Sequence, residues 1–255
     1  LKDKDFDPAV GLALHEGSHI LLSDFKFLQD LSNHFPEDII NTVMIKYDYD
    51  RSSAVWHIQK NLKDLLNIVE DRRIDNYVFK SAPGYKGYYH SMYDKYFNSK
   101  IIDKGLASSE FRIPTFEAYM FRICNITNNH RDLNALPGLR KIWNIMDLKN
   151  IGNVKDTQEA FAIACDIYRV IESNIEAPKP QDNDCEGECD GSGNGQGTEN
   201  RDGGTPKTPE GESDDDGSTT TGTDCTNGNT TSTIDLEDLT DKQKQQLKKA
   251  IQKQK

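Results

Sequence analysis

Two observations predict a mainly α-helical domain, and a third predicts a disordered acidic linker and a short C-terminal helix after it. Apolar residues recur three or four positions apart over most of residues 1–177, which is the spacing of one helix face. No region shows the sustained alternation of apolar and polar residues that indicates strands. Residues 178–232 are mostly Gly, Ser, Thr, Asn and Asp, too polar to offset the chain entropy lost on folding. We therefore expect a helical domain over 1–177, a disordered linker over 178–232 and, over 233–255, a short helix that starts a following domain.

The predicted helices follow one another along the first domain. Asp7 and Pro8 look like an N-cap and a first helical residue, so we expect the first helix to run to about residue 24. Pro36, followed by two acidic residues, starts another helix. The longest helix is expected over 52–79, where a Ser-Ala-Pro-Gly sequence ends it. Further helices are expected over 25–35, 85–97, 114–126, 136–146 and 157–175 and, after the linker, over 234–251.

The acidic charge of the chain lies in one segment. The 255 residues carry a formal net charge of −11. Residues 181–230 hold 13 of the 42 acidic residues and only 2 of the 31 basic ones, so the remainder has 29 of each. Because there is no basic surplus, we expect neither nucleic acid nor a membrane as a partner.

The cysteines and the absence of targeting signals favour a cytoplasmic location. The sequence has no signal peptide and no apolar run long enough to span a bilayer. Its five cysteines are an odd number without a disulfide framework. Cys124 and Cys165 lie in apolar helical patterns and look like buried thiols. Cys185 and Cys189 are not spaced like a zinc knuckle. A reducing compartment is the simplest explanation.

The first helix carries an H-E-x-x-H motif at residues 15–19. On a helix, His15 and His19 stand one turn apart on the same face, where two imidazoles can bind one Zn²⁺. Glu16 lies beside them, where its carboxylate can take the proton of a water molecule whose pKa the metal lowers. The motif is typical of zinc metallopeptidases. Apolar residues on both sides predict a helix that is buried over much of its surface. The alternative is a pair of surface histidines on an amphipathic helix.

A catalytic zinc site usually has three protein ligands. The metzincin pattern places Gly and His three and six residues after the motif. This chain has Leu22 and Phe25 at those positions, so that class is excluded. The third ligand is then expected to be an acidic residue on a later helix, as in gluzincins.

Three carboxylates within the longest predicted helix are candidates for that ligand. Glu70, Asp71 and Asp75 lie there among apolar residues. Buried carboxylates are unfavourable unless they are paired or bound to a metal. Pairing with Arg72 and Arg73 is the alternative to metal binding.

The two segments together resemble a known family. H-E-G-S-H-I-L-L-S-D-F followed by N-I-V-E-D-R-R-I-D is similar to the metallopeptidase-like domain found ahead of von Willebrand factor A (VWA) domains in bacterial and phage proteins. The resemblance covers roughly residues 8–97. It implies a zincin-like helical metallopeptidase domain with Zn²⁺ as the cofactor, in a bacterial cell or a phage-infected host. An acidic linker and a VWA domain often follow in that family.

By this resemblance, Glu70 is the third zinc ligand. Its helix face also passes through Asn67 and Ile74, two positions that we expect to be buried. One departure keeps Asp71 open as the ligand. Usual gluzincins place an Asp four residues after the ligand Glu, where this chain has Ile74, whereas Asp71 and Asp75 do have that spacing.

We therefore expect a zinc-dependent metallopeptidase, a hydrolase acting on a protein or peptide substrate. His15, His19 and Glu70 would bind Zn²⁺, and Glu16 would act as the general base. A Tyr or His from residues 85–90 could stabilise the oxyanion. The alternative is a non-catalytic, zinc-stabilised interaction module that works with a VWA domain and, as the resemblance suggests, a MoxR-type ATPase.

Overall fold

The computed structural model describes residues 6–177 and 239–254, and these residues form helices without any strand. The prediction of a mainly α domain is confirmed, whereas the predicted disordered linker over 178–232 lies outside the described residues. The α-helices are α1 (Phe6–Leu22), α2 (Phe25–Gln29), α3 (Glu37–Tyr47), α4 (Arg51–Ser81), α5 (Lys86–Tyr96), α6 (Lys100–Ala107), α7 (Phe116–Cys124), α8 (Leu139–Met146), α9 (Thr157–Glu172) and α10 (Asp241–Gln252). Short 3₁₀ turns lie at Leu31–His34, Pro83–Tyr85, Glu110–Arg112 and Ile151–Asn153.

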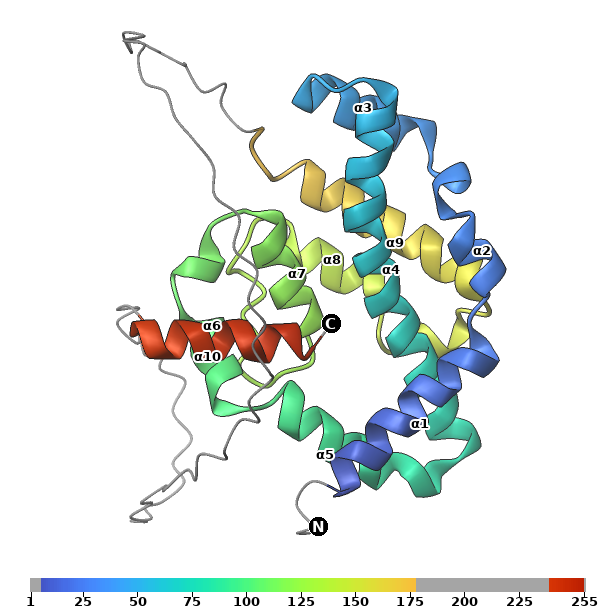
Figure 1. Ribbon diagram of the computed structural model, residues 1–255, viewed down its shortest axis with the longest axis vertical. Helices are drawn as coiled ribbons and strands as arrows, with labels where there is room; N and C mark the ends of the chain where they lie inside the picture. The colour runs from blue at the N-terminus through green and yellow to red at the C-terminus, as the bar shows by residue number, and fades with distance from the viewer. Residues whose placement is uncertain (1–5, 178–238, 255) are drawn as a thin grey trace, which may run out of the picture. The chain divides into compact units, whose positions relative to one another are not determined.

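Helix α4 is the longest of the described helices and packs against α1, α3, α7 and α9 (Figure 1). It begins after Asp50, whose carboxylate accepts a hydrogen bond from the Ser53 amide at 2.8 Å, and it ends before Pro83. The predicted helix over 52–79 is therefore confirmed. Its inner face is apolar, and a fully buried residue such as Leu62 contributes about 1.5–3 kcal/mol. Helices α3, α7 and α9 cover that face.

A smaller apolar cluster lies at the C-terminal end of α4, where α1 and α5 cross (Figure 1). Val78 and Met92 are part of it. The two crossing helices are closest at Gly11, where a Cβ atom would lie 2.3 Å from the carbonyl oxygen of Tyr88. Any larger residue at Gly11 would push α1 away from α5. This approach fixes the position of the helix that carries the H-E-x-x-H motif.

The rest of α1 lies on the surface. Within this helix, only Pro8, Gly11 and His15 are buried. Ile20 and Leu21 have 73% and 83% of their surface exposed. The prediction that α1 is buried over much of its surface is therefore wrong, because only one narrow face of the helix meets α4 and α5. None of the described helices combines the length and the apolar character needed to cross a bilayer.

Helices α6 and α10 pack against each other across a long sequence separation (Figure 1). Leu247 of α10 is only 2% exposed, and a Cβ atom on Gly105 would lie 3.0 Å from its methyl carbons. Gln254 and Asn125 exchange hydrogen bonds between their amide groups, at 2.9 and 3.2 Å. Helix α10 belongs to the same compact unit as helices α1 to α9. That residues 233–255 start a following domain stays a prediction.

Candidate metal centre

The side chains of His15, His19 and Asp71 converge where α1 meets α4. The Nε2 atoms of the two histidines are 3.3 Å apart. Oδ1 of Asp71 lies 3.1 Å from Nε2 of His19 and 3.6 Å from Nε2 of His15. Among the described residues, this is the one group of three or more His, Cys, Asp or Glu side chains whose ligand atoms all lie within 4.8 Å of one another.

The spacing of these three atoms fits a zinc ion. Four ligands in a tetrahedron at about 2.0–2.2 Å from zinc are about 3.3–3.6 Å from one another. The three separations in the site run from 3.1 to 3.6 Å. Two imidazole nitrogens and one carboxylate oxygen are also a ligand set that zinc accepts. The residues present can therefore hold zinc and leave a fourth position open.

Both imidazoles are oriented by a hydrogen bond on their other nitrogen. Nδ1 of His15 lies 2.9 Å from Oδ1 of Asp75, and Nδ1 of His19 lies 3.1 Å from Oγ of Ser23. A proton held on Nδ1 leaves the lone pair of Nε2 free for a metal. Ser23 is not among the site residues predicted from the sequence. Its position four residues after His19, one helical turn away, could have indicated this contact.

The carboxylate of Asp75 is itself held by a chain of hydrogen bonds. Its Oδ2 accepts a hydrogen bond from the hydroxyl of Tyr93 on α5. That hydroxyl accepts one from Nη1 of Arg72 at 2.7 Å, and Nη2 of Arg72 donates to the carbonyl oxygen of Cys124 at 3.0 Å. Residues from α4, α5 and α7 thus fix the ring of His15, which reduces the rearrangement needed when a metal binds.

The site favours a cation. Burial lowers the pKa of His15, but the nearby carboxylates of Asp71 and Asp75 outweigh burial and raise this pKa to about 10. Burial raises the pKa of Asp71, but the nearby imidazoles of His15 and His19 outweigh burial and lower it to about 2. At neutral pH the metal-free site therefore holds a proton on His15 next to the anionic carboxylate of Asp71. A metal ion that binds there must displace this proton.

Glu70, the expected third ligand, is not in this group. On its helix face Ile74 is buried as expected. The expectation that Asn67 is buried is wrong, because Asn67 is exposed.

The carboxylate of Glu70 accepts two hydrogen bonds from the guanidinium of Arg73, at 2.7 and 2.8 Å, and one from Oγ1 of Thr157 at 2.7 Å. Arg73 also donates to the carbonyl oxygen of Leu22 at 2.7 Å, at the C-terminal end of α1. Glu70 is therefore paired with an arginine, which was the alternative to metal binding. Asp71 is the carboxylate that lies near the Nε2 atoms of both histidines.

The three candidate ligands lie in the wall of a cleft of about 450 Å³. The exposed side chain of Glu16 lines the cleft next to the histidines. Leu12, Ile20 and Phe25 add apolar surface to it. No residue from 85–90 lines the cleft, although Tyr93 of the same helix does.

Comparisons of the chain with protein-family models, with curated proteins and with solved structures give no match. The resemblance to the domain found ahead of VWA domains therefore stays a prediction. The function of the site has to be inferred from its geometry and chemistry.

Proposed function

We propose that this protein is a zinc-dependent metallopeptidase with His15, His19 and Asp71 as the metal ligands. The observation that carries the proposal is the convergence of their three ligand atoms, at tetrahedral spacing, in the wall of a cleft. Zinc held there would polarise the scissile carbonyl group and lower the pKa of a water molecule. The proposal replaces Glu70 with Asp71, because Glu70 is engaged by Arg73.

Glu16 is the general base in this proposal. It follows His15 on α1, and its carboxylate is exposed to the cleft. There it can accept a proton from the attacking water and pass it to the leaving amine. Proton transfer by a positioned carboxylate is worth about 10²–10⁴ in rate.

Other residues of the chain position these groups. Asp75 and Ser23 keep the Nδ1 protons of the two histidines in place, which is how outer hydrogen-bond partners tune a metal ligand. The apolar cleft surface of Leu12, Ile20 and Phe25 can bind a large apolar side chain next to the scissile bond.

The test compares Glu16→Gln with Glu110→Gln in the zinc-loaded full-length chain. Glu110 is exposed on a 3₁₀ turn and serves as the matched control. Hydrolysis of casein and of a quenched-fluorescent peptide library should fall by about 10²–10⁴-fold for Glu16→Gln, with zinc content and melting temperature unchanged. The control should keep the full rate.

Equal rates for the two variants would refute the proposed base. If the zinc-loaded chain hydrolyses nothing, the alternative gains support. That alternative is an interaction module that uses zinc for stability and works with a VWA domain and a MoxR-type ATPase.

A further inference from the structure

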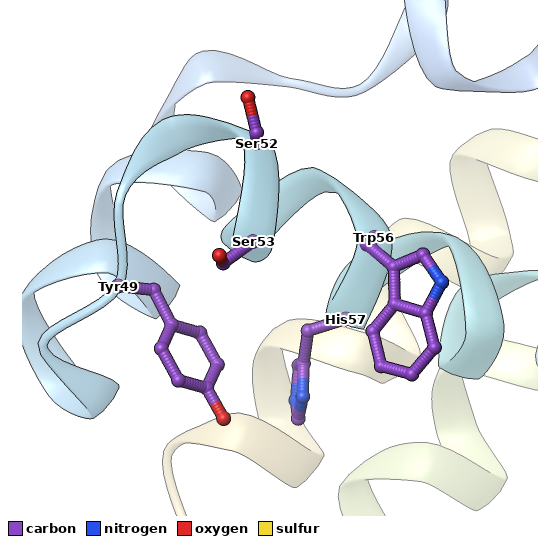
Figure 2. A pocket seen from close by; sticks show the side chains of 5 residues that line it. All are labelled: Tyr49, Ser52, Ser53, Trp56 and His57. Carbon is purple, nitrogen blue, oxygen red and sulfur yellow. The ribbon is translucent and has the colours of Figure 1, made fainter.

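A second hollow, which we call the aromatic notch, lies at the N-terminal end of α4 (Figure 2). Its volume is about 480 Å³, and it is lined by Tyr49, Ser52, Ser53, Trp56 and His57. In Figure 2 the ring of His57 lies between those of Tyr49 and Trp56. Trp56 is 67% exposed. An indole that is exposed at the edge of a hollow is typical of a contact residue in an interface.

The buried carboxylate of Glu172 holds the wall of the aromatic notch in place. Glu172, 5% exposed, accepts hydrogen bonds from Nζ of Lys46 at 2.8 Å and from the hydroxyl of Tyr47 at 3.0 Å. Nε2 of His57 lies 3.8 Å from the same carboxylate. The ring of Tyr47 stacks on that of Tyr49, with centroids 5.6 Å apart. The notch is therefore formed before any ligand arrives, which lowers the entropy lost on binding.

One face of α4 joins the aromatic notch to the metal cleft. Residues three or four apart on a helix share a face. From the notch toward the metal centre, the residues on this face are Trp56, Lys60, Lys63, Asn67 and Asp71. The first four are exposed, and the last three line the metal cleft. The helix rises about 22 Å between Trp56 and Asp71.

The middle of this face carries two positive charges. Lys60 and Lys63 are exposed and form no ion pair with any residue that the structure describes. Two ammonium groups between an aromatic hollow and a cleft attract carboxylates and repel basic side chains. The charge of this face therefore favours an acidic chain.

We propose that this face of α4 recognises an extended acidic peptide substrate, an inference that rests on the proposed peptidase function. A large apolar side chain of the peptide occupies the aromatic notch, and its Asp or Glu residues lie over Lys60 and Lys63. An extended chain advances about 3.3 Å per residue. The scissile bond of the peptide therefore lies about six or seven residues from the side chain in the notch.

The test measures peptide binding apart from hydrolysis. The full-length chain carries Glu16→Gln, so that bound peptide is not cleaved, and it is loaded with zinc. The probe is a fluorescein-labelled peptide with one Phe, two Glu within the next four positions, and a Leu-Phe pair seven residues from the first Phe. Fluorescence anisotropy should show binding, and exchanging both Glu for Lys should weaken it by about tenfold or more.

Substitutions on the face should weaken binding, and matched substitutions elsewhere should not. Trp56→Ala, and separately Lys60→Glu together with Lys63→Glu, should each weaken binding by about tenfold. Tyr77→Ala removes an aromatic side chain that is 54% exposed on the same helix, and Lys141→Glu reverses an exposed lysine on α8. Both control variants should bind the peptide as the parent does.

The indole of Trp56 gives a direct readout of the notch. The chain has two tryptophans, so Trp143→Phe leaves Trp56 as the sole indole. Its emission should shift to shorter wavelength when the acidic peptide binds. Unchanged emission, or equal binding of the Lys-exchanged peptide, would overturn the proposal. The proposal would also be overturned if the emission shifted with salt concentration in the absence of peptide. The face would then bind the acidic residues 181–230 of the chain itself.

Failure of this inference can be distinguished from failure of the proposed function. Peptide binding that depends on Trp56 and Lys60, with no hydrolysis by the zinc-loaded chain that keeps Glu16, would keep the recognition surface and reject the peptidase. Hydrolysis by the chain that keeps Glu16, insensitive to Trp56→Ala and to peptide charge, would keep the peptidase and reject the surface.

Discussion

Asp71→Asn should mainly weaken zinc binding, whereas Glu70→Gln should mainly reduce stability, although the two residues are neighbours on α4. Asp71 Oδ1 lies 3.1 and 3.6 Å from the two histidine nitrogens. Its replacement removes a ligand, so zinc affinity should fall by more than about 100-fold, beyond the loss expected for an orienting partner. That is more than about 2.8 kcal/mol, at 1.4 kcal/mol per factor of ten. The metal-free protein should also lose stability, because Asp71 is a partner of the protonated His15. That loss should be smaller than for Glu70→Gln, because the side chain of Asp71 is 23% exposed and that of Glu70 only 3%.

Glu70→Gln should instead reduce stability. The carboxylate of Glu70 and the guanidinium of Arg73 form a buried pair, with side chains 3% and 6% exposed. Removing one charge of such a pair costs about 3–5 kcal/mol. At roughly 2–4 °C per kcal/mol for a domain of this size, the melting temperature should fall by about 6–20 °C. Zinc affinity should fall by no more than about tenfold, because Glu70 acts on the histidines only through the end of α1.

Two measurements on each variant separate these effects. Thermal unfolding of the metal-free protein gives stability, and competition with a chromophoric chelator gives zinc affinity. Asp75→Asn provides an intermediate case, with affinity reduced by about 10- to 100-fold, because its carboxylate orients His15. If Glu70→Gln loses zinc more severely than Asp71→Asn, the reasoning is refuted and Glu70 becomes the ligand.

Four further outcomes are expected. Because the pKa of metal-free His15 is raised to about 10, zinc binding near pH 7.5 should release about one proton, measurable by calorimetry in buffers of different ionisation enthalpy; no release would contradict the raised pKa. The same shift stabilises the metal-free protein fully below about pH 6.5, and that stabilisation is lost as the pH rises through about 10. Gly11→Ala should displace α1 from Tyr88 and lower both melting temperature and zinc affinity; unchanged values would show that the helices can adjust. Leu247→Asp should release α10, seen as faster amide exchange in α10 and α6, because it puts a charge against Gly105; unchanged exchange would show that this contact does not hold α10.

Local signals predict much of this fold. Asp50 caps α4 and Pro83 follows its end, so the central helix can be located from the sequence to within two residues. Asp156 caps α9 by accepting a hydrogen bond from the Glu159 amide at 2.9 Å. Such signals act between residues three or four positions apart, where the sequence records them directly.

Contacts between distant residues are not recorded in this way. Helix α6 has no predicted counterpart, because its partner Leu247 lies 142 positions after Gly105 and the two meet only in the folded chain. The position of α10 depends on the same contact. The apolar residues Ile20 and Leu21 favour burial in the sequence but lie on the surface.

In the candidate site, too, local signals identify some residues, whereas contacts between distant residues decide others. His15, Glu16 and His19 can be identified from their spacing on one helix. The choice between Glu70 and Asp71 depends on a rotation of about 100° around the axis of α4. That rotation is set by distant partners of the helix, including Leu22 and Thr157, which no local pattern indicates.

Zinc binding by His15, His19 and Asp71 can be tested by metal analysis of the purified full-length chain, combined with X-ray absorption at the zinc edge. We expect one zinc per chain, with two imidazole nitrogens, one carboxylate oxygen and one further light atom at about 2.0–2.2 Å. The zinc should be lost in Asp71→Asn and kept in Glu70→Gln. A chain that is folded without zinc, or a zinc ion bound mainly by sulfur, would contradict this assignment.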